Sequence, residues 1–326
     1  MRKVLEVRNL QVRFPTRHGA LIAVDDVSLH VGEGEVLGLV GESGAGKSLT
    51  GSAVIGLLDP PGHISAGHII LDGRRIDNLA REEMRRIRGG IIGTIFQDPL
   101  TSLDPLQTIG GQLVETIVTH TPLGNRQACA HAIDLLAAVG VPEPKLRARQ
   151  FPHEFSGGMR QRAVIALALC AGPRLVIADE PTTALDVSTQ AQVIALLKDL
   201  CREQGTAMML ITHDMGVIAE MADRVTVMYA GRIAESGPVR QMVHHARHPY
   251  TRGLMDSIPR IGQVLDRLPQ IDGTMPRPGD IPSGCAFHPR CRNAIDRCRQ
   301  ERPDTVKHEQ GEVACWRITA TGVARA

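Results

Sequence analysis

The stretch VLGLVGESGAGKS, residues 36–48, decides the fold. Its first five residues are an unbroken apolar run, which is typical of a strand buried on both faces of a sheet. The remaining eight match the pattern G-x-x-x-x-G-K-[ST], and a stretch that can form a helix follows them to about residue 58. A glycine-rich turn between a buried strand and a helix is the context in which this pattern binds phosphate groups.

Each part of this turn has a physical role in binding phosphate. The glycines let the backbone pass close to the phosphates, successive N–H groups form an anion nest, and the helix N-terminus adds partial positive charge. We expect Lys47 to reach the β- and γ-phosphates and the Ser48 hydroxyl to ligate Mg²⁺. The alternative is a tight turn with an incidental lysine. The predicted nucleotide contacts are Gly41, Glu42, Ser43, Gly44, Ala45, Gly46, Lys47 and Ser48.

Three further segments rich in apolar residues, 175–178, 207–211 and 224–228, predict more buried strands. Between the first two, apolar residues recur at helical spacing from Val193 to Cys201. Strands that alternate with helices predict a parallel α/β sheet with right-handed crossovers.

Other parts of the chain have different patterns. Residues 5–7 and 11–14 predict two half-buried strands. Residues 98–158 contain no buried-strand run, and apolar residues from Cys129 to Val139 predict an amphipathic helix, so we expect a helical insertion there. Six prolines in residues 259–290 argue against long regular elements in that segment.

Composition limits the possible functions. Among 326 residues, 37 Lys and Arg against 35 Asp and Glu leave a net charge of +2, which gives no electrostatic reason to bind nucleic acid. Aromatic residues make up 2%, too few for a surface that stacks bases. The longest apolar run, residues 163–171, is too short to cross a bilayer, and no signal peptide is visible. We expect a cytosolic chain, in which stable disulfides are rare.

Two acidic residues, Asp179 and Glu180, follow the predicted strand at 175–178. A carboxylate beside a phosphate loop can hold Mg²⁺ through water, and a second can orient or deprotonate the attacking water. The alternative is an ordinary acidic turn before Pro181. Phosphoryl transfer needs both a metal-positioning and a water-positioning group, which favours the catalytic interpretation.

Together with the phosphate loop, four motifs resemble those of the ATPase subunit of ATP-binding cassette (ABC) transporters over roughly residues 1–235. They are FSGGMRQ (155–161) for the signature motif, FQDP (96–99) for the Q-loop, TALD (183–186) for the D-loop and ITHD (211–214) for the switch histidine. The resemblance implies a P-loop ABC ATPase fold, which has a RecA-like parallel-sheet core, an N-terminal antiparallel β subdomain and a helical insertion. It also implies a nucleotide-binding domain at 1–235, with the insertion at about 98–158, and a small cysteine-rich region at 236–326.

The signature motif begins a helix whose free N–H groups can bind phosphate, although a plain serine N-cap looks the same in sequence. The resemblance implies that Ser156, Gly157, Gly158 and Asp186 contact ATP bound to the opposite subunit, so that two subunits close over two ATP molecules. Met159 stands where the family usually has glutamine, and the backbone donors are unaffected by that change.

Three more residues take their roles from the resemblance. Gln97 would offer its side-chain carbonyl to Mg²⁺ or water, His213 would contact the γ-phosphate, and Phe14 would stack on adenine. The alternatives are a solvated surface glutamine, a structural histidine and a core phenylalanine. The predicted catalytic residues are Glu180, His213 and Gln97. The predicted Mg²⁺ ligands are Ser48, Gln97 and Asp179.

A narrower resemblance covers nearly the whole chain. HPYTRGL (248–254) and GCAFHPRC (284–291) resemble segments of dipeptide/oligopeptide (Dpp/Opp-type) and nickel importer ATPases, and SGGMRQR (156–162) resembles their D-type subunit. It implies ATP-driven peptide import, an F-type partner ATPase, two transmembrane permease subunits and an extracytoplasmic solute-binding protein. It also implies a peripheral place on the cytoplasmic side of the inner membrane.

Four of the seven cysteines, Cys285, Cys291, Cys298 and Cys315, gather near the C-terminus, and their grouping suggests a Cys₄ metal site. The spacing lacks the short knuckle of structural zinc, although His288 or His308 could replace one ligand, and free thiols remain an alternative. The resemblance implies a [4Fe–4S] cluster. Because these residues lie outside every nucleotide motif, we expect a structural or assembly role, with ATP binding preserved when they are replaced. We expect Cys129, Cys170 and Cys201 to fill the core.

Other functions remain open. A nickel or other small-solute importer of the same family is one, and a soluble ABC ATPase acting on ribosomes or DNA is another. The single phosphate loop and the absence of sustained heptads count against the second. An iron–sulfur sensor that keeps the fold is a third, against which the set Lys47, Asp179, Glu180 and His213 argues.

Overall fold

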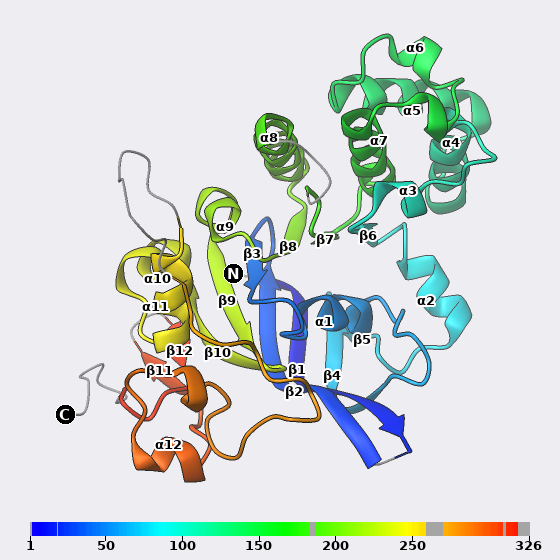
Figure 1. The fold of residues 1–326 in the computed structure, drawn as a ribbon. Coiled ribbons are helices and arrows are strands. Elements are labelled where there is room, and N and C mark those ends of the chain that lie inside the picture. Colours follow the sequence, from blue (N-terminus) through cyan, green and yellow to red (C-terminus); the bar gives the residue numbers. More distant parts are fainter. Residues whose placement is uncertain (1, 18, 183–186, 259–269, 309–310, 319–326) are drawn as a thin grey trace. The chain divides into compact units, whose positions relative to one another are not determined.

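The structure is a computed structural model, and it describes residues 2–17, 19–182, 187–258, 270–308 and 311–318. It divides into two compact units, each of which is described by itself (Figure 1). Unit 1 comprises Met1–Leu5, Val31–Glu35 and Asn78–Leu210, and unit 2 comprises Glu6–His30, Val36–Asp77 and Ile211–Ala326.

Unit 1 contains three neighbouring strands, β6 (Ile92–Ile95), β7 (Leu175–Asp179) and the start of β8 (Ala207–Thr212). β6 and β7 run parallel, with Ile92 opposite Leu175. β7 and β8 confirm the strands predicted from their apolar runs. β6 was not predicted, because it has only four residues and closely follows two glycines.

Helices make up most of the rest of unit 1, and residues 98–158 contain helices and no strand, as the sequence predicts. In α4 the buried residues Ile109, Leu113 and Ile117 recur every four residues, so one side of the helix packs into the core. One prediction here is wrong: Cys129 is exposed, because it lies on the outer side of α5, one residue beyond the buried Ala128. The helices are α2 (Arg81–Ile87), α3 (Pro99–Ser102), α4 (Ile109–His120), α5 (Asn125–Ala138), α6 (Pro144–Arg147), the 3₁₀ turn η1 (Pro152–Glu154), α7 (Gly157–Leu169) and α8 (Val187–Gln204).

Unit 2 carries strands in the order β11-β12-β10-β9-β3. β3 and β9 are parallel and were both predicted, whereas β10, β12 and β11 pair antiparallel. The chain therefore returns after the proline-rich segment to extend the same sheet. The strands are β3 (Val36–Val40), β9 (Arg224–Tyr229), β10 (Arg232–Pro238), β11 (Val306–His308) and β12 (Gly311–Val313).

A second sheet, most of whose residues belong to unit 2, has the order β2-β1-β4-β5, with bounds β1 (Lys3–Thr16), β2 (Gly19–Gly32), β4 (His63–Leu71) and β5 (Arg74–Arg75). The two short strands predicted near the N-terminus are one strand, β1. Asn9 in its middle has a φ of 49°, and its side chain donates to Asp26 across 2.8 Å. This local break explains why the pattern looked like two strands.

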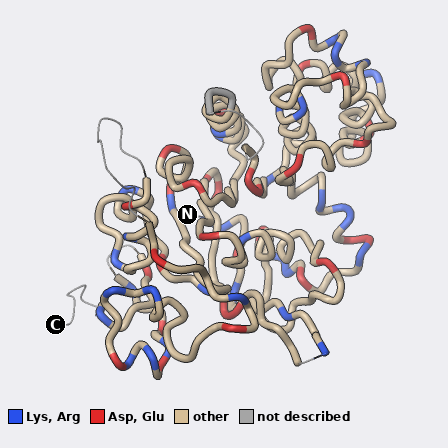
Figure 2. The backbone as a smooth tube through the Cα atoms, viewed as in Figure 1, with Lys and Arg blue, Asp and Glu red and all other residues tan. Residues whose placement is uncertain are grey.

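The helices of unit 2 are short. They are α1 (Lys47–Val54), α9 (Met215–Met221), α10 (Val239–His245), α11 (Pro249–Asp256), the 3₁₀ turn η2 (His288–Arg290) and α12 (Asp296–Gln300). Basic and acidic residues are interspersed along the described chain (Figure 2). No helix in the described parts of the chain is both long and apolar enough to cross a bilayer.

Candidate functional site

The phosphate loop of unit 2 joins β3 to α1, as the sequence predicts. Lys47 is 5% exposed, and its Nζ donates to the carbonyl oxygens of Gly41 at 2.7 Å and Glu42 at 3.0 Å. Gly46, the N-cap of α1, has a φ of 97°, a conformation that favours glycine. Ser43, Gly44 and Ser48 are exposed, so the outer side of the loop is open to a ligand.

The inner side of the loop is packed against β9 and the turn that follows it. A Cβ on Gly41 would lie 2.3 Å from the carbonyl oxygen of Met228, so only glycine fits there. The carbonyl of Ala45 accepts from the N–H of Gly231 at 3.0 Å. These contacts fix where the loop runs.

A group of three polar residues lies at the end of β7 in unit 1. Asp179 and Glu180 are half-buried, and Glu180 has a φ of 46°, which is unusual for a residue other than glycine. The amide nitrogen of Gln97 donates to a carboxylate oxygen of Glu180 at 2.9 Å. The structure thus brings together Gln97 and Glu180, 83 residues apart, at the place where the sequence predicts a catalytic carboxylate.

The signature motif forms the start of α7. Ser156 is the N-cap, and its hydroxyl accepts from the N–H of Met159 at 3.3 Å. Ser156 and Gly157 are exposed, and a Cβ on Gly157 would meet no atom within 4 Å. The helix N-terminus is therefore accessible, which phosphate binding there requires.

Three of the predicted site residues remain: His213, Phe14 and Asp186. His213 follows β8 directly and is exposed. Phe14 is half-buried near the end of β1, and its ring packs against Gly62. Asp186 lies outside the described residues.

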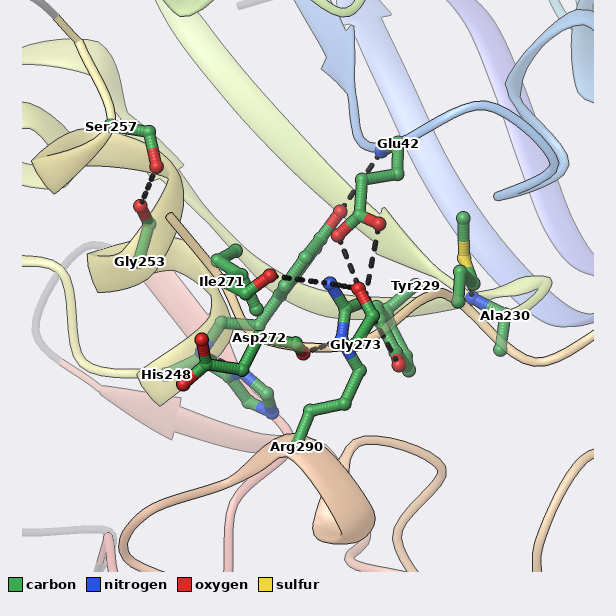
Figure 3. A network of polar contacts seen from close by, with 12 residues as sticks. Glu42, Tyr229, Ala230, His248, Gly253, Ser257, Ile271, Asp272, Gly273 and Arg290 are labelled. Carbon is green, nitrogen blue, oxygen red and sulfur yellow. Dashed lines mark hydrogen bonds and ion pairs between the residues drawn. The ribbon is translucent and has the colours of Figure 1, made fainter. Parts of the chain in front are cut away.

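Glu42 in the phosphate loop is held by two residues of the C-terminal half of the chain, a feature that the sequence analysis missed. The backbone N–H of Glu42 donates to the hydroxyl of Tyr250 at 2.9 Å. Nη1 of Arg290 lies 3.0 and 3.1 Å from the two carboxylate oxygens of Glu42. Figure 3 shows the Arg290 side chain reaching to Glu42 beside Tyr229. The sequence analysis assigned Tyr250 and Arg290 no role at the phosphate loop. They lie 208 and 248 residues from Glu42 in the chain, and no local sequence pattern links residues so far apart.

All four C-terminal cysteines line one small cavity in unit 2, together with Phe287 and Trp316. Cys298 is buried and the other three are partly buried. Burial, with smaller contributions from the neighbouring cysteines, raises the pKa of Cys285 to about 11. Burial also raises the pKa values of Cys291 and Cys315. The thiols of these three residues are therefore protonated at neutral pH when no metal is bound.

Three of these sulfurs accept backbone hydrogen bonds that oppose this effect. The donors are the N–H groups of Phe287, Asn293 and Arg317, each two residues after its cysteine. Such bonds orient a thiol and stabilise its thiolate form. Within the described ranges, however, no three His, Cys, Asp or Glu side chains are placed to hold one metal ion.

Comparison with known proteins agrees with these features. Residues 24–183 match the ABC transporter family, and residues 234–298 match the oligopeptide/dipeptide transporter C-terminal region. The chain is 47% identical to a putative peptide import ATP-binding protein of Brucella melitensis, over 97% of this chain and 98% of that protein. It is equally identical, with the same coverage, to the oligopeptide transport ATP-binding protein OppD of Haemophilus influenzae. It is 45% identical to the dipeptide transport ATP-binding protein DppD of Bacillus subtilis, over 97% of this chain and 95% of that protein.

Among solved structures, the ATP-binding cassette MJ0796, a dimer bound to ADP and Pi, is similar with a TM-score of 0.65 and 27% identity. The similarity covers 72% of this chain and 99% of that one. CbiO1 from Clostridium perfringens, part of an ABC transporter complex, gives a TM-score of 0.64 at 26% identity, over 75% of this chain and 92% of that one.

Proposed function

This chain belongs to the ATP-binding subunits of oligopeptide and dipeptide ABC importers, and on that basis we propose how its residues bind and hydrolyse ATP. The subunit hydrolyses ATP to ADP and phosphate, and works with permease subunits to drive peptide uptake. The observation that best supports the residue roles is the loop at 41–48, with its glycine backbone, buried lysine and open outer side.

ATP would bind with its phosphates along this loop and its adenine on the ring of Phe14. The ammonium of Lys47, which now donates to two carbonyls of its own loop, would move its hydrogen bonds to the β- and γ-phosphates. Ser48, Asp179 and Gln97 would hold Mg²⁺, which neutralises charge that develops on the phosphates. Their hydroxyl and carboxylate oxygens and carbonyl group suit a hard cation.

Glu180 would orient the attacking water and accept its proton. Its half-buried carboxylate and its hydrogen bond from Gln97 support this role, because both restrict where the carboxylate oxygens lie. His213 would contact the γ-phosphate. Its exposed position directly after β8 makes it accessible to a ligand.

A second ATPase subunit would complete each site. The open N-terminus of α7, with Ser156, Gly157 and Gly158, supports binding to ATP held by that partner, and Asp186 would assist. The ADP- and Pi-bound cassette MJ0796, a dimer, is a precedent for paired cassettes. We propose an F-type ATPase as the partner, and a solute-binding protein that delivers the peptide.

The permeases would dock on unit 1. Phe96, Leu100 and Leu106 are 44%, 60% and 85% exposed and lie close together in the chain, so they offer apolar surface that a partner would cover. Phe96 follows β6, Leu100 lies in α3 and Leu106 follows α3, so all three belong to the segment that contains Gln97. This docking would place the subunit peripherally on the cytoplasmic side of the inner membrane.

We further propose that Cys285, Cys291, Cys298 and Cys315 hold a [4Fe–4S] cluster. The donor set fits, because four thiols line one cavity and three of them accept backbone N–H groups. Bound, a cluster supplies covalent cross-links to a segment with few regular elements.

Nucleotide binding and metal analysis test these assignments. Lys47→Ala in the purified full chain should abolish measurable ATP binding in titration calorimetry, because it removes the phosphate counter-charge. Unchanged affinity would contradict the site. Anaerobically purified protein should contain about four iron and four sulfide per chain, and serine at any of the four cysteines should lower both. Serine at the exposed Cys129 is the matched control, and stoichiometric zinc without iron would contradict the cluster.

A further inference from the structure

We propose that Tyr250 and Arg290 are positioning residues of the ATP site, and that through them the four-cysteine region sets the affinity of the phosphate loop for ATP. This inference rests on the proposed function. It concerns residues that make no contact with nucleotide themselves, and it differs from our expectation that the cysteines are independent of ATP binding.

The first observation is how the dipeptide Gly41–Glu42 is held. Lys47 binds both of its carbonyl groups, Tyr250 accepts its Glu42 N–H, and Arg290 binds its carboxylate. When Lys47 turns to a phosphate, its two hydrogen bonds to the dipeptide are lost. The contacts of Tyr250 and Arg290 do not involve Lys47, so they keep the dipeptide in place while ATP binds.

The second observation is that the Arg290 side chain is buried and that its donors are occupied. Its side chain is 7% exposed, and its Nε donates to the carbonyl of Asp272 at 2.8 Å. Nη2 lies within hydrogen-bond distance of the carbonyls of Ile271 and Gly273, and Nη1 also reaches the Tyr229 hydroxyl at 3.4 Å. A guanidinium with its donors occupied in this way has little freedom, so it fixes the Glu42 carboxylate in one place.

The third observation links these contacts to the cysteines. Arg290 ends the η2 turn and Cys291 follows it, while the N–H of His288 in the same turn donates to the carbonyl of Cys285 at 2.9 Å. Phe287, whose N–H donates to the Cys285 sulfur, packs against Tyr250 with ring centroids 5.4 Å apart. A change in the geometry of the cysteines therefore displaces the residues that touch Glu42.

The Tyr229 ring completes the packing. It lies edge-on to Tyr250 at 4.7 Å and to Phe287 at 5.2 Å, and it follows Met228, whose carbonyl abuts Gly41. The phosphate loop and the cysteine-bearing turn thus share one aromatic support, so neither can move without repacking these rings.

The test measures ATP affinity of the full chain by titration calorimetry, which gives Kd and the fraction of active protein separately. Tyr250→Phe removes one hydroxyl and should raise Kd about three- to tenfold with an unchanged active fraction. Glu42→Gln should raise Kd by a similar factor. The double variant Glu42→Gln with Arg290→Gln should have a Kd no higher than that of the poorer single variant, because both substitutions remove the same Glu42–Arg290 ion pair. The control Arg292→Gln removes an arginine that is 84% exposed and pairs with exposed Asp272, and it should leave Kd unchanged.

Three further measurements test the positioning role and the link to the cysteines. In the assembled transporter, Tyr250→Phe should raise KM for ATP and leave kcat within about twofold, since the hydroxyl touches no reacting atom. Cys291→Ser should also raise the Kd for ATP of the isolated chain. A non-hydrolysable ATP analogue should in turn slow amide exchange in residues 285–292, since coupling is reciprocal.

Unchanged Kd values in Tyr250→Phe and Glu42→Gln would overturn the proposal, and so would a reduced active fraction at constant Kd. An unchanged Kd in Cys291→Ser would overturn the link to the cysteines. Failure of the unmodified chain to bind ATP would instead contradict the proposed function, so the two failures are distinguishable.

Discussion

Glu180 shows how a single backbone conformation can place a chemical group. Its φ of 46° turns the chain sharply after β7, and the Gln97 amide fixes the carboxylate at 2.9 Å. A positive φ at a residue other than glycine is unfavourable, and such strain is concentrated at functional sites. The sequence predicts a catalytic carboxylate at this position, whereas the turn and the contact with Gln97 are visible only in the structure.

Replacing Glu180 by glutamine tests its role in hydrolysis. Glu180→Gln keeps the shape of the side chain and removes the base, so ATP binding should persist while hydrolysis in the assembled transporter slows by roughly 10²–10⁴-fold. Steady-state phosphate release measures the rate. The matched control is Glu82→Gln, which changes an exposed glutamate of α2 and should leave the rate unchanged. Near-normal turnover in Glu180→Gln would contradict the assignment.

At the scale of elements, α11 depends on a buried histidine. The ring Nδ1 of His248 accepts from the N–H of Tyr250 at 3.1 Å and caps the helix that carries Tyr250. Burial lowers the pKa of His248 to about 4, and a hydrogen bond to Ala314 opposes this shift. The histidine is therefore neutral in the folded protein, and an acceptor nitrogen for the cap is available.

This burial makes stability depend on pH. The unfolded chain binds a proton at His248 below about pH 6.5, and the folded chain binds it only near pH 4, so stability falls as the pH drops between these values. The loss should reach about 3 kcal/mol at the acid end. Urea denaturation measures the free energy of unfolding at each pH. In this pH window the free energy of unfolding should fall more steeply for the wild type than for His248→Asn, which keeps a capping oxygen. Parallel pH profiles would contradict a neutral His248.

The elements that the sequence predicts best are those with a strong local pattern. β3 is a continuous apolar run, β7, β8 and β9 are rich in apolar residues, and the phosphate loop has a fixed spacing of glycines. β10 escaped prediction because RIAESGP has neither an apolar run nor clear alternation. Cys129 was wrongly placed in the core, since a position one residue away from Ala128 lies about 100° round the helix.

At the scale of the whole molecule, the parts that sequence cannot predict are contacts between distant residues. The pairs Glu42–Arg290 and Gln97–Glu180 join segments with no shared periodicity, and only folding brings them together. The family resemblance gave a role to each nucleotide motif, but it gave the HPY segment no contact with the phosphate loop. The expected boundary near residue 235 stays a prediction.

A composite site makes a prediction about the assembled transporter. Because the space around Gly157 is open, Gly157→Glu should fit the free subunit without a clash, and an acidic residue suits the first turn of a helix. Its charge should nevertheless repel the phosphates of ATP bound by the partner subunit. In a complex with one altered subunit, nucleotide trapping should show hydrolysis lost at the partner's phosphate loop and ATP binding retained at the altered subunit's own loop.

Gly124→Glu is the matched control, since Gly124 also begins a helix and also has open space around it. It should leave hydrolysis at both loops intact. Loss confined to the altered subunit's own loop in Gly157→Glu would contradict a site shared between subunits.

The most direct test of the account is ATP-driven peptide uptake by the complete transporter in proteoliposomes, with ATP on the face where this subunit binds. The account predicts uptake of a labelled di- or oligopeptide that requires hydrolysable ATP and the solute-binding protein, and that stops when this subunit carries Glu180→Gln. Peptide uptake that continues at the same rate with Glu180→Gln, or a complex that hydrolyses ATP but transports only another solute such as nickel, would contradict it.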